Sequence, residues 1–245
     1  SQLIDSGFGP FALEWIARSA GGAFISVRPS GSSSLGGKST WPTGSEQHFD
    51  PGVMKKYTPD YLAPTEYRQF VASNKARQAL IDAAQLPRAT VLTQPTTSFV
   101  RRNEADLKKR IMSAQKDAAR VSPQLEKLVE VLSVGEGDRA KLTEPRWQAS
   151  YDLAYGRALA ARVRAEGYNA MLAALSRGKN FENEGSNTWY LEPADTIDVG
   201  SLYQKMADKA HEILQRVVRE HPQTPWAKEA EEDLRTPLGW KWSEG

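Results

Sequence analysis

The sequence predicts a mainly α-helical protein: an antiparallel bundle of long helices containing a coiled-coil-like hairpin, preceded by the closing helix and strand of an α/β domain. Two long runs of apolar residues, spaced alternately by three and four, predict the hairpin. A third feature, in residues 13–27, predicts the α/β end, because a helical pattern there stops at a glycine pair and passes straight into an apolar strand.

The helix-to-strand passage near the beginning of the chain is built from local signals. Leu13, Ile16 and Ala17 fall on one helical face, and Gly21-Gly22 supply residues that end a helix at little cost. The segment 23–27 is then a short apolar run of the type found in buried strands. This pattern is typical of the last helix and strand of an α/β unit.

These residues resemble the end of a von Willebrand factor A (VWA) domain of the planctomycete type, which would make 1–28 the C-terminal remnant of that domain. The segments 187–193 and 236–242 resemble further parts of the same proteins. The resemblance implies an exported protein of the periplasm or cell envelope. It also implies adhesion or assembly through protein binding, since VWA domains are generally interaction modules.

The metal site that this resemblance would imply is missing from the sequence. VWA domains hold Mg²⁺ or Ca²⁺ through a D-x-S-x-S motif and further oxygen ligands, and no D-x-S-x-S occurs here. The serines of 30–34 lie in a Gly/Ser loop without the aspartate and are interpreted as a flexible surface loop. We therefore predict no metal and no cofactor. Ser1, in place of Met, favours a longer parent chain, so one expected partner is the missing part of the same domain.

Composition excludes several classes of function. The 245 residues are 40% hydrophobic and 25% charged, as in ordinary globular proteins, and the net charge of +2 gives no reason to expect nucleic-acid binding. No apolar run approaches the roughly 18 residues that span a bilayer. The lack of cysteine excludes disulfides, thiolate metal sites and cysteine nucleophiles.

Residues 29–63 form a connector rich in Pro, Gly and Ser. Its aromatic and apolar side chains favour a segment that wraps over the body of the protein, because a flexible spacer has no use for them. These side chains include Trp41, Phe49, Val53, Met54, Tyr57 and Tyr61. Helical patterns then begin at Pro64 and at Lys75, Pro87 ends the second, and 88–100 is predicted to be extended.

The bundle proper occupies 64–245, with its hairpin in the middle. The first seam consists of Leu107, Ile111, Ala114, Ala118, Val121, Leu125, Leu128 and Leu132. Ser122-Pro123 interrupts it as a predicted N-cap and first helical residue, so two helices or one kinked helix are expected. After a turn at 134–138, a helix over 145–177 carries the second seam: Trp147, Tyr151, Ala154, Ala158, Ala161, Ala165, Tyr168, Leu172 and Leu175. The two seams are predicted to pack antiparallel.

The C-terminal part is predicted to contain a loop over 180–200 and two further helices. The first runs to His221-Pro222, and Thr224-Pro225 caps the second. Residues 199–235 resemble one tetratricopeptide-like (TPR-like) hairpin, through the P-x-T-P-W-A pattern at 222–227. A single hairpin cannot form a solenoid, so it is expected to complete the bundle.

No catalytic constellation is evident. His48, His211 and His221 are far apart, and no H-E-x-x-H, G-x-S-x-G or Walker loop occurs. His48 with Asp50 would be only two metal ligands in a Pro/Gly loop. The carboxylates are interpreted as solvated helix surfaces, and His221 as a charge suited to a helix C-terminus. The sequence therefore predicts that the protein is not an enzyme, with no catalytic residues.

Two groups of residues are candidates for binding a partner. Arg101 and Arg102, close to the basic run 108–110, form either a patch for phosphate or an acidic partner, or an outer helix face. Trp226, Trp240 and Trp242 either anchor the tail on the bundle or bind a partner as hot spots. Packing is favoured for the tryptophans, because an undocked tail would expose apolar surface.

The function predicted from these observations is a non-enzymatic protein–protein interaction or scaffold subunit of a larger assembly. Two alternatives remain open at this point. One is a VWA-type accessory subunit of a metal chelatase or AAA+ machine, and the other is a TPR-like peptide-binding module that uses residues 199–242.

Overall fold

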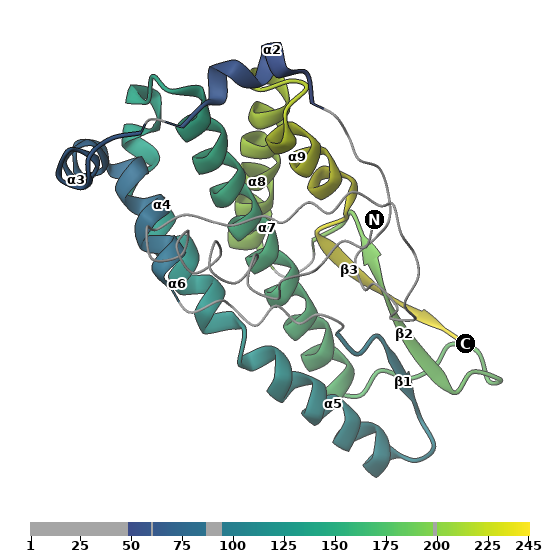
Figure 1. Ribbon diagram of the computed structural model, residues 1–245. Coiled ribbons are helices and arrows are strands. Elements are labelled where there is room, and N and C mark those ends of the chain that lie inside the picture. Colours follow the sequence, from purple (N-terminus) through teal and green to yellow (C-terminus); the bar gives the residue numbers. More distant parts are fainter. Residues whose placement is uncertain (1–48, 60, 87–94, 198–199) are drawn as a thin grey trace, which may run out of the picture. The chain divides into compact units, whose positions relative to one another are not determined.

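Helices dominate the computed structural model, and a three-stranded antiparallel sheet packs beside them (Figure 1). The structure describes residues 49–59, 61–86, 95–197 and 200–245. The chain divides into two units, 1–47 and 48–245, and the described elements belong to the second. The predicted helix and strand within 1–28, and most of the connector, lie outside the described residues. The prediction of a mainly α-helical chain is confirmed.

The first described elements are short helices whose starts follow local capping rules. They are α2 (Pro51–Met54), the 3-10 helix η1 (Lys55–Tyr57), α3 (Pro64–Ala72) and α4 (Lys75–Gln85). The Asp50 carboxylate accepts a hydrogen bond from the Gly52 amide and caps α2. The Asn74 side chain accepts from the amides of Ala76 and Arg77 and caps α4. Both helices predicted to start at Pro64 and Lys75 are confirmed.

The first seam forms two helices, α5 (Glu104–Ala119) and α6 (Ser122–Ser133). Seven of its eight apolar residues are buried, and Leu128 is half-buried. The predicted capping role of Ser122 is wrong. Arg120 and Val121 stay in the α-helical region of φ and ψ, so the chain never takes the extended conformation that an N-cap needs. The Ser122 hydroxyl instead donates to Glu166 Oε1 at 2.7 Å.

Helix α7 (Pro145–Ser176) lies at the centre of the described unit (Figure 1). Helix α6 runs antiparallel to it, because successive hydrogen bonds join Leu132 to Tyr151 and Glu126 to Arg162, and α5 also packs on α7. Its other side is also buried, against α8 (Ser201–Glu220). This second face was not predicted. At Gly156 on this face, a Cβ atom would lie 2.9 Å from Leu214 Cδ2, so any larger residue would force the Leu214 side chain to shift.

The hairpin after α7 is formed by α8 and α9 (Pro225–Arg235). Thr224 caps α9 as predicted, since its Oγ1 accepts a hydrogen bond from the Ala227 amide at 3.2 Å. Leu214 and Val217 of α8 pack on Ala230 of α9 and form a small core of their own. The hairpin thus packs both on itself and on α7.

Three strands far apart in the sequence form the sheet, in the order β1 (Ser98–Val100), β2 (Thr188–Ala194) and β3 (Gly239–Glu244). The register pairs Phe99 with Trp189 and Leu191 with Trp242. The prediction of a loop throughout 180–200 is therefore wrong, because β2 lies inside it. Phe99, Trp189 and Leu191 share one face of the sheet, which packs on buried residues of α5 and α7.

Candidate functional site

Trp240 fastens β3 to α7. Its indole N–H donates to the carbonyl oxygen of Arg164 at 2.9 Å, and its ring packs on Tyr168 with 5.8 Å between centroids. A Cβ atom at Gly167 would lie 3.1 Å from Trp240 Cδ1, so the absence of a side chain lets the indole lie close to the helix. Burial raises the pKa of Tyr168 to about 12, so its hydroxyl stays protonated and donates to the carbonyl of Thr96.

Trp242, two residues further on, packs on the sheet itself. Its ring meets Phe99 and Trp189 edge to face, at centroid distances of 5.8 and 6.1 Å. Trp189 also stacks on Phe181 at 4.6 Å. The two tail tryptophans are half-buried and hold β3 in place, as the packing interpretation predicted. Their assignment as partner-binding residues stays a prediction.

The outer edge of β3 presents backbone groups that β2 does not use. Thr188 and Gly245 exchange both backbone hydrogen bonds, at 2.9 and 3.0 Å. Because bonded and non-bonded pairs alternate in an antiparallel ladder, the amides and carbonyls of Trp240, Trp242 and Glu244 point away from β2. Within the described ranges, no other residue forms a hydrogen bond with these outward backbone groups. Among the described residues, the sheet therefore ends at β3 with these backbone groups unused.

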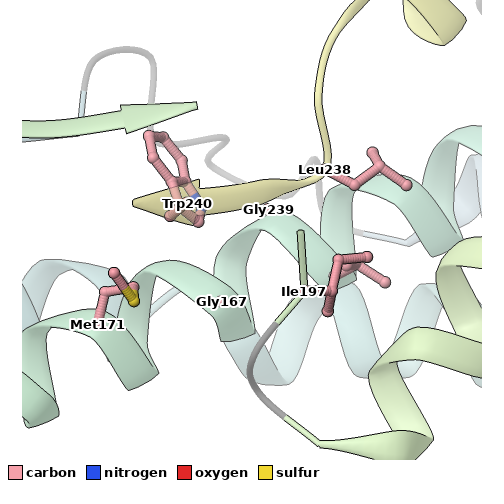
Figure 2. A pocket seen from close by; sticks show the side chains of 7 residues that line it. Gly167, Met171, Ile197, Leu238, Gly239 and Trp240 are labelled. Atoms are coloured by element: carbon pink, nitrogen blue, oxygen red, sulfur yellow. The ribbon is translucent and has the colours of Figure 1, made fainter. Parts of the chain in front are cut away.

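A small apolar depression lies beside this edge (Figure 2). Val163, Gly167 and Met171 of α7 form one wall, and Ile197, Leu238, Gly239 and Trp240 form the rest. Its free volume of about 10 Å³ has room for no more than a methyl-sized group. At Gly239, where β3 begins, a Cβ atom would lie 1.7 Å from the carbonyl oxygen of Thr196, so the backbone here leaves no room for a side chain.

Arg101 joins this region from the far side of the sheet. Its guanidinium lies over the Phe181 ring at 4.5 Å, and Phe181 in turn stacks on Trp189. Arg101 also lies 3.5 Å from Glu104, which weakens it as a binding cation. Arg102 is exposed. The structure thus links Arg101 to Trp242 through an aromatic stack, while Arg102 stands apart from both.

Trp226 lies away from the sheet, at the start of α9. Its ring stacks on Tyr57 at 5.3 Å, and its indole N–H donates to Ser150 Oγ at 3.1 Å. Arg146 donates to the carbonyl oxygen of Tyr57 and adds a second attachment. Within the described part of the connector, Tyr57 therefore packs on the bundle, while the predicted wrapping of 29–63 as a whole stays a prediction. Trp226 acts there as an internal anchor.

A buried ion-pair network, not predicted from the sequence, joins three elements. Asp152 of α7 is fully buried, and its carboxylate accepts hydrogen bonds from Arg139 of η2 (Glu136–Lys141) and Arg216 of α8. Arg139 also pairs with Glu220 at 2.6 Å. The interpretation of carboxylates as solvated helix surfaces is wrong for Asp152, because its partners come from other elements and only the tertiary fold brings them together.

His221 is buried at the end of α8, with its Nδ1 atom 3.0 Å from the Tyr57 hydroxyl. Burial lowers its pKa, and the nearby Arg139 guanidinium lowers it further. This shift opposes the partial positive charge that was predicted to suit the C-terminus of the helix. His211 is half-buried on α8, and His48 lies outside the described residues.

The described residues contain no group of three or more His, Asp or Glu side chains placed to hold a metal. A larger polar cleft of about 250 Å³ lies between α8 and the segment that joins α9 to β3. Its lining includes the acidic Asp195 and Asp208 and the basic Arg235, so it carries both signs of charge. The edge of β3 is consequently the candidate functional site.

Comparison with protein-family models, curated proteins and solved structures finds no match for this chain. The VWA and TPR-like resemblances accordingly stay predictions. No helix in the described ranges is both long and apolar enough to cross a membrane.

Proposed function

We propose that this chain is a non-enzymatic protein-interaction subunit of a larger assembly, and that the outer edge of β3 binds an extended segment of a partner protein. The open backbone edge at Trp240, Trp242 and Glu244 carries the proposal. Peptides commonly bind by adding a strand to such an edge, where backbone hydrogen bonds give affinity and side-chain pockets give specificity. The segment would add antiparallel or parallel to β3.

Side-chain contacts of Trp240 and Trp242 fix the backbone of β3 before any partner binds. The indole of Trp240 is hydrogen-bonded to α7, and Trp242 packs between aromatic rings of β1 and β2. A strand that is already fixed loses little conformational entropy when a partner pairs with it. These contacts therefore favour a binding role in which the tryptophans position the backbone.

Features beside the edge restrict the partner's sequence. The depression lined by Gly167 and Met171 admits only a small apolar side chain such as alanine. On the opposite face of the sheet, Lys241 lies 3.8 Å from Glu192, and a lysine on an edge strand discourages indiscriminate pairing. We therefore expect a short segment with a small apolar residue facing α7 and polar residues facing solvent.

The proposal also includes three more detailed predictions, on the pairing of the long helices, the origin of the α8–α9 hairpin and the origin of residues 1–28. We propose that α7 pairs with α5 and α6 in coiled-coil register, which the antiparallel contacts support. The hairpin of α8 and α9 supports a TPR-like origin, and slower hydrogen exchange in α8 and α9 when a peptide is added would test its use as a peptide-binding module. The proposed VWA-like origin concerns residues 1–28, and the sequence upstream of Ser1 tests it through the presence of D-x-S-x-S.

Hydrogen exchange followed by NMR tests whether the edge is open. The outward amide of Trp242 should exchange much faster than the amides of Lys241 and Ser243, which pair with β2. Equally slow exchange at Trp242 would show that the edge is already covered and would reject the proposal.

Binding is tested with peptides of about nine residues selected from a display library on the intact chain. A semisynthetic chain with N-methyl-Trp242 keeps the indole but loses the outward N–H, so its affinity should fall by about tenfold or more. The unmethylated semisynthetic chain is the control, and circular dichroism checks that both fold. Equal affinities for the two chains would contradict binding at this edge.

A further inference from the structure

The solvent-facing side of α5 carries cations that the fold does not use. Leu107, Ile111, Ala114 and Ala118 define the buried side of this helix. At about 100° per residue, Lys109, Met112, Lys116 and Arg120 fall on the opposite side, and all four are exposed. We call these four residues the α5 stripe.

The three cations of the α5 stripe lie in one row along the helix. In the described part of the chain, Lys109, Lys116 and Arg120 have no ion-pair partner. Arg110, on the flank of the helix, is paired with Asp106 at 3.0 Å. Several cations on the other long elements do have carboxylate partners, among them Lys127, Arg157, Arg162, Lys209, Arg216 and Lys228. Within the described residues, the stripe thus places three cations without ion-pair partners on one face of one helix.

Met112 adds an apolar contact in the middle of this charge. It is 60% exposed, which makes it one of six large hydrophobic side chains exposed in the described residues. It lies three residues after Lys109 and four before Lys116, so the three side chains form one continuous row. A flexible methionine between cations suits a surface that adapts to an apolar side chain of a partner.

We propose that the α5 stripe binds an acidic amphipathic helix of a partner protein. A row with helical spacing, about 16 Å long from Lys109 to Arg120, matches the row of side chains on a helix lying alongside it. Carboxylates of that helix would pair with the three cations, and one of its apolar residues would pack on Met112. This surface is separate from the edge of β3. The two binding proposals can therefore be tested independently.

Charge and burial favour a protein over the other anionic partners. A helix that lies on a membrane inserts its apolar face, and the apolar face of α5 is already buried against the bundle. The whole chain carries a net charge of only +2, so it lacks the broad basic surface that generally marks nucleic-acid binding. A short row of cations around one apolar side chain fits a helix better.

The test uses the full chain and a labelled helical peptide of about 20 residues that carries Glu on one face and Leu on the other. The triple variant Lys109→Gln, Lys116→Gln, Arg120→Gln should bind it about tenfold more weakly, measured by fluorescence anisotropy at low salt. The matched control is Lys55→Gln, Lys56→Gln, Lys205→Gln, which removes the same charge from exposed residues elsewhere. It should bind within about twofold of the unaltered chain. Met112→Ala should weaken binding without changing its salt dependence.

Three outcomes would overturn the proposal. Equal weakening in both triple variants would show that only net charge matters. Tighter binding to phosphatidylserine vesicles or to single-stranded DNA than to the acidic peptide would assign the stripe to a membrane or a nucleic acid. Equal affinity for a peptide with Lys in place of Glu would show that the carboxylates play no part.

Discussion

The hydroxyl of Tyr57 lies 3.0 Å from Nδ1 of His221, although the two residues are 164 positions apart in the chain. Tyr57 is the last residue of η1, and His221 ends α8. The Nε2 atom of His221 is buried and has no hydrogen-bond partner among the described residues. The stability of this contact therefore depends on the protonation state of a single imidazole.

The free energy of unfolding should decrease as the pH falls below 6.5. Burial and Arg139 lower the pKa of His221 in the folded state, so the unfolded chain, with a pKa near 6.5, binds the proton first. Glu220 and Asp152 oppose this shift but do not reverse it. Urea unfolding between about pH 8 and 5 should show the loss. His221→Gln should reduce this pH dependence, while His211→Gln should retain it. Unchanged pH dependence in His221→Gln would contradict the assignment.

Trp226→Ala should release residues 51–57 from the bundle. The change removes the ring that stacks on Tyr57 and the hydrogen bond to Ser150, and should cost about 2–3 kcal/mol of stability. Limited trypsin digestion should then cleave at Lys55 and Lys56 faster than in the unaltered chain. Tyr61→Ala is the control, because Tyr61 is 93% exposed and its loss should change neither result. Equal cleavage rates in both variants would reject the anchoring role.

Asp152→Asn should destabilise the protein strongly. It leaves Arg139 and Arg216 close together without their shared buried carboxylate, and breaking a buried ion pair typically costs about 3–5 kcal/mol. Chemical unfolding measures the loss. Asp208→Asn, on an exposed part of α8, should change stability by less than about 0.5 kcal/mol. Similar stabilities for the two variants would show that the buried network contributes little.

Gly156→Ala should lower stability even though alanine favours helices. The added methyl group would meet Leu214 at 2.9 Å, and such overpacking costs about 1–3 kcal/mol against a gain of about 1 kcal/mol in helix propensity. Gly137→Ala is the comparison, since nothing lies within 4 Å of its added methyl group. If the Gly156→Ala midpoint in urea rises, the close approach of α7 and α8 would be refuted.

Most helix boundaries could be predicted because their signals are local. Pro64, Lys75 and Thr224-Pro225 mark starts that depend on residues within one helical turn, and the structure places helices there. The kink after Arg120 was also expected, although Ser122 does not cap the second helix. Such features need no knowledge of the rest of the chain.

The sheet and the candidate site could be predicted only in part. Trp240 and Trp242 were recognised as important aromatic residues, but the open edge depends on which of their backbone groups face β2. That orientation is a property of the register between strands 50 residues apart. A three-residue strand such as β1 carries too little alternation to be recognised by itself.

By itself, the sequence determined the helices, the buried seam of α5 and α6, and the anchoring of an aromatic tail, because apolar periodicity and capping act over a few residues. Only the tertiary structure decided that α7 is buried on two sides and that Asp152 pairs with arginines from two elements. It also decided that β3 is the last strand of the described sheet, with backbone groups that no described residue uses. Those features depend on contacts between distant residues, whose side chains and backbone groups carry no local sign of their partners.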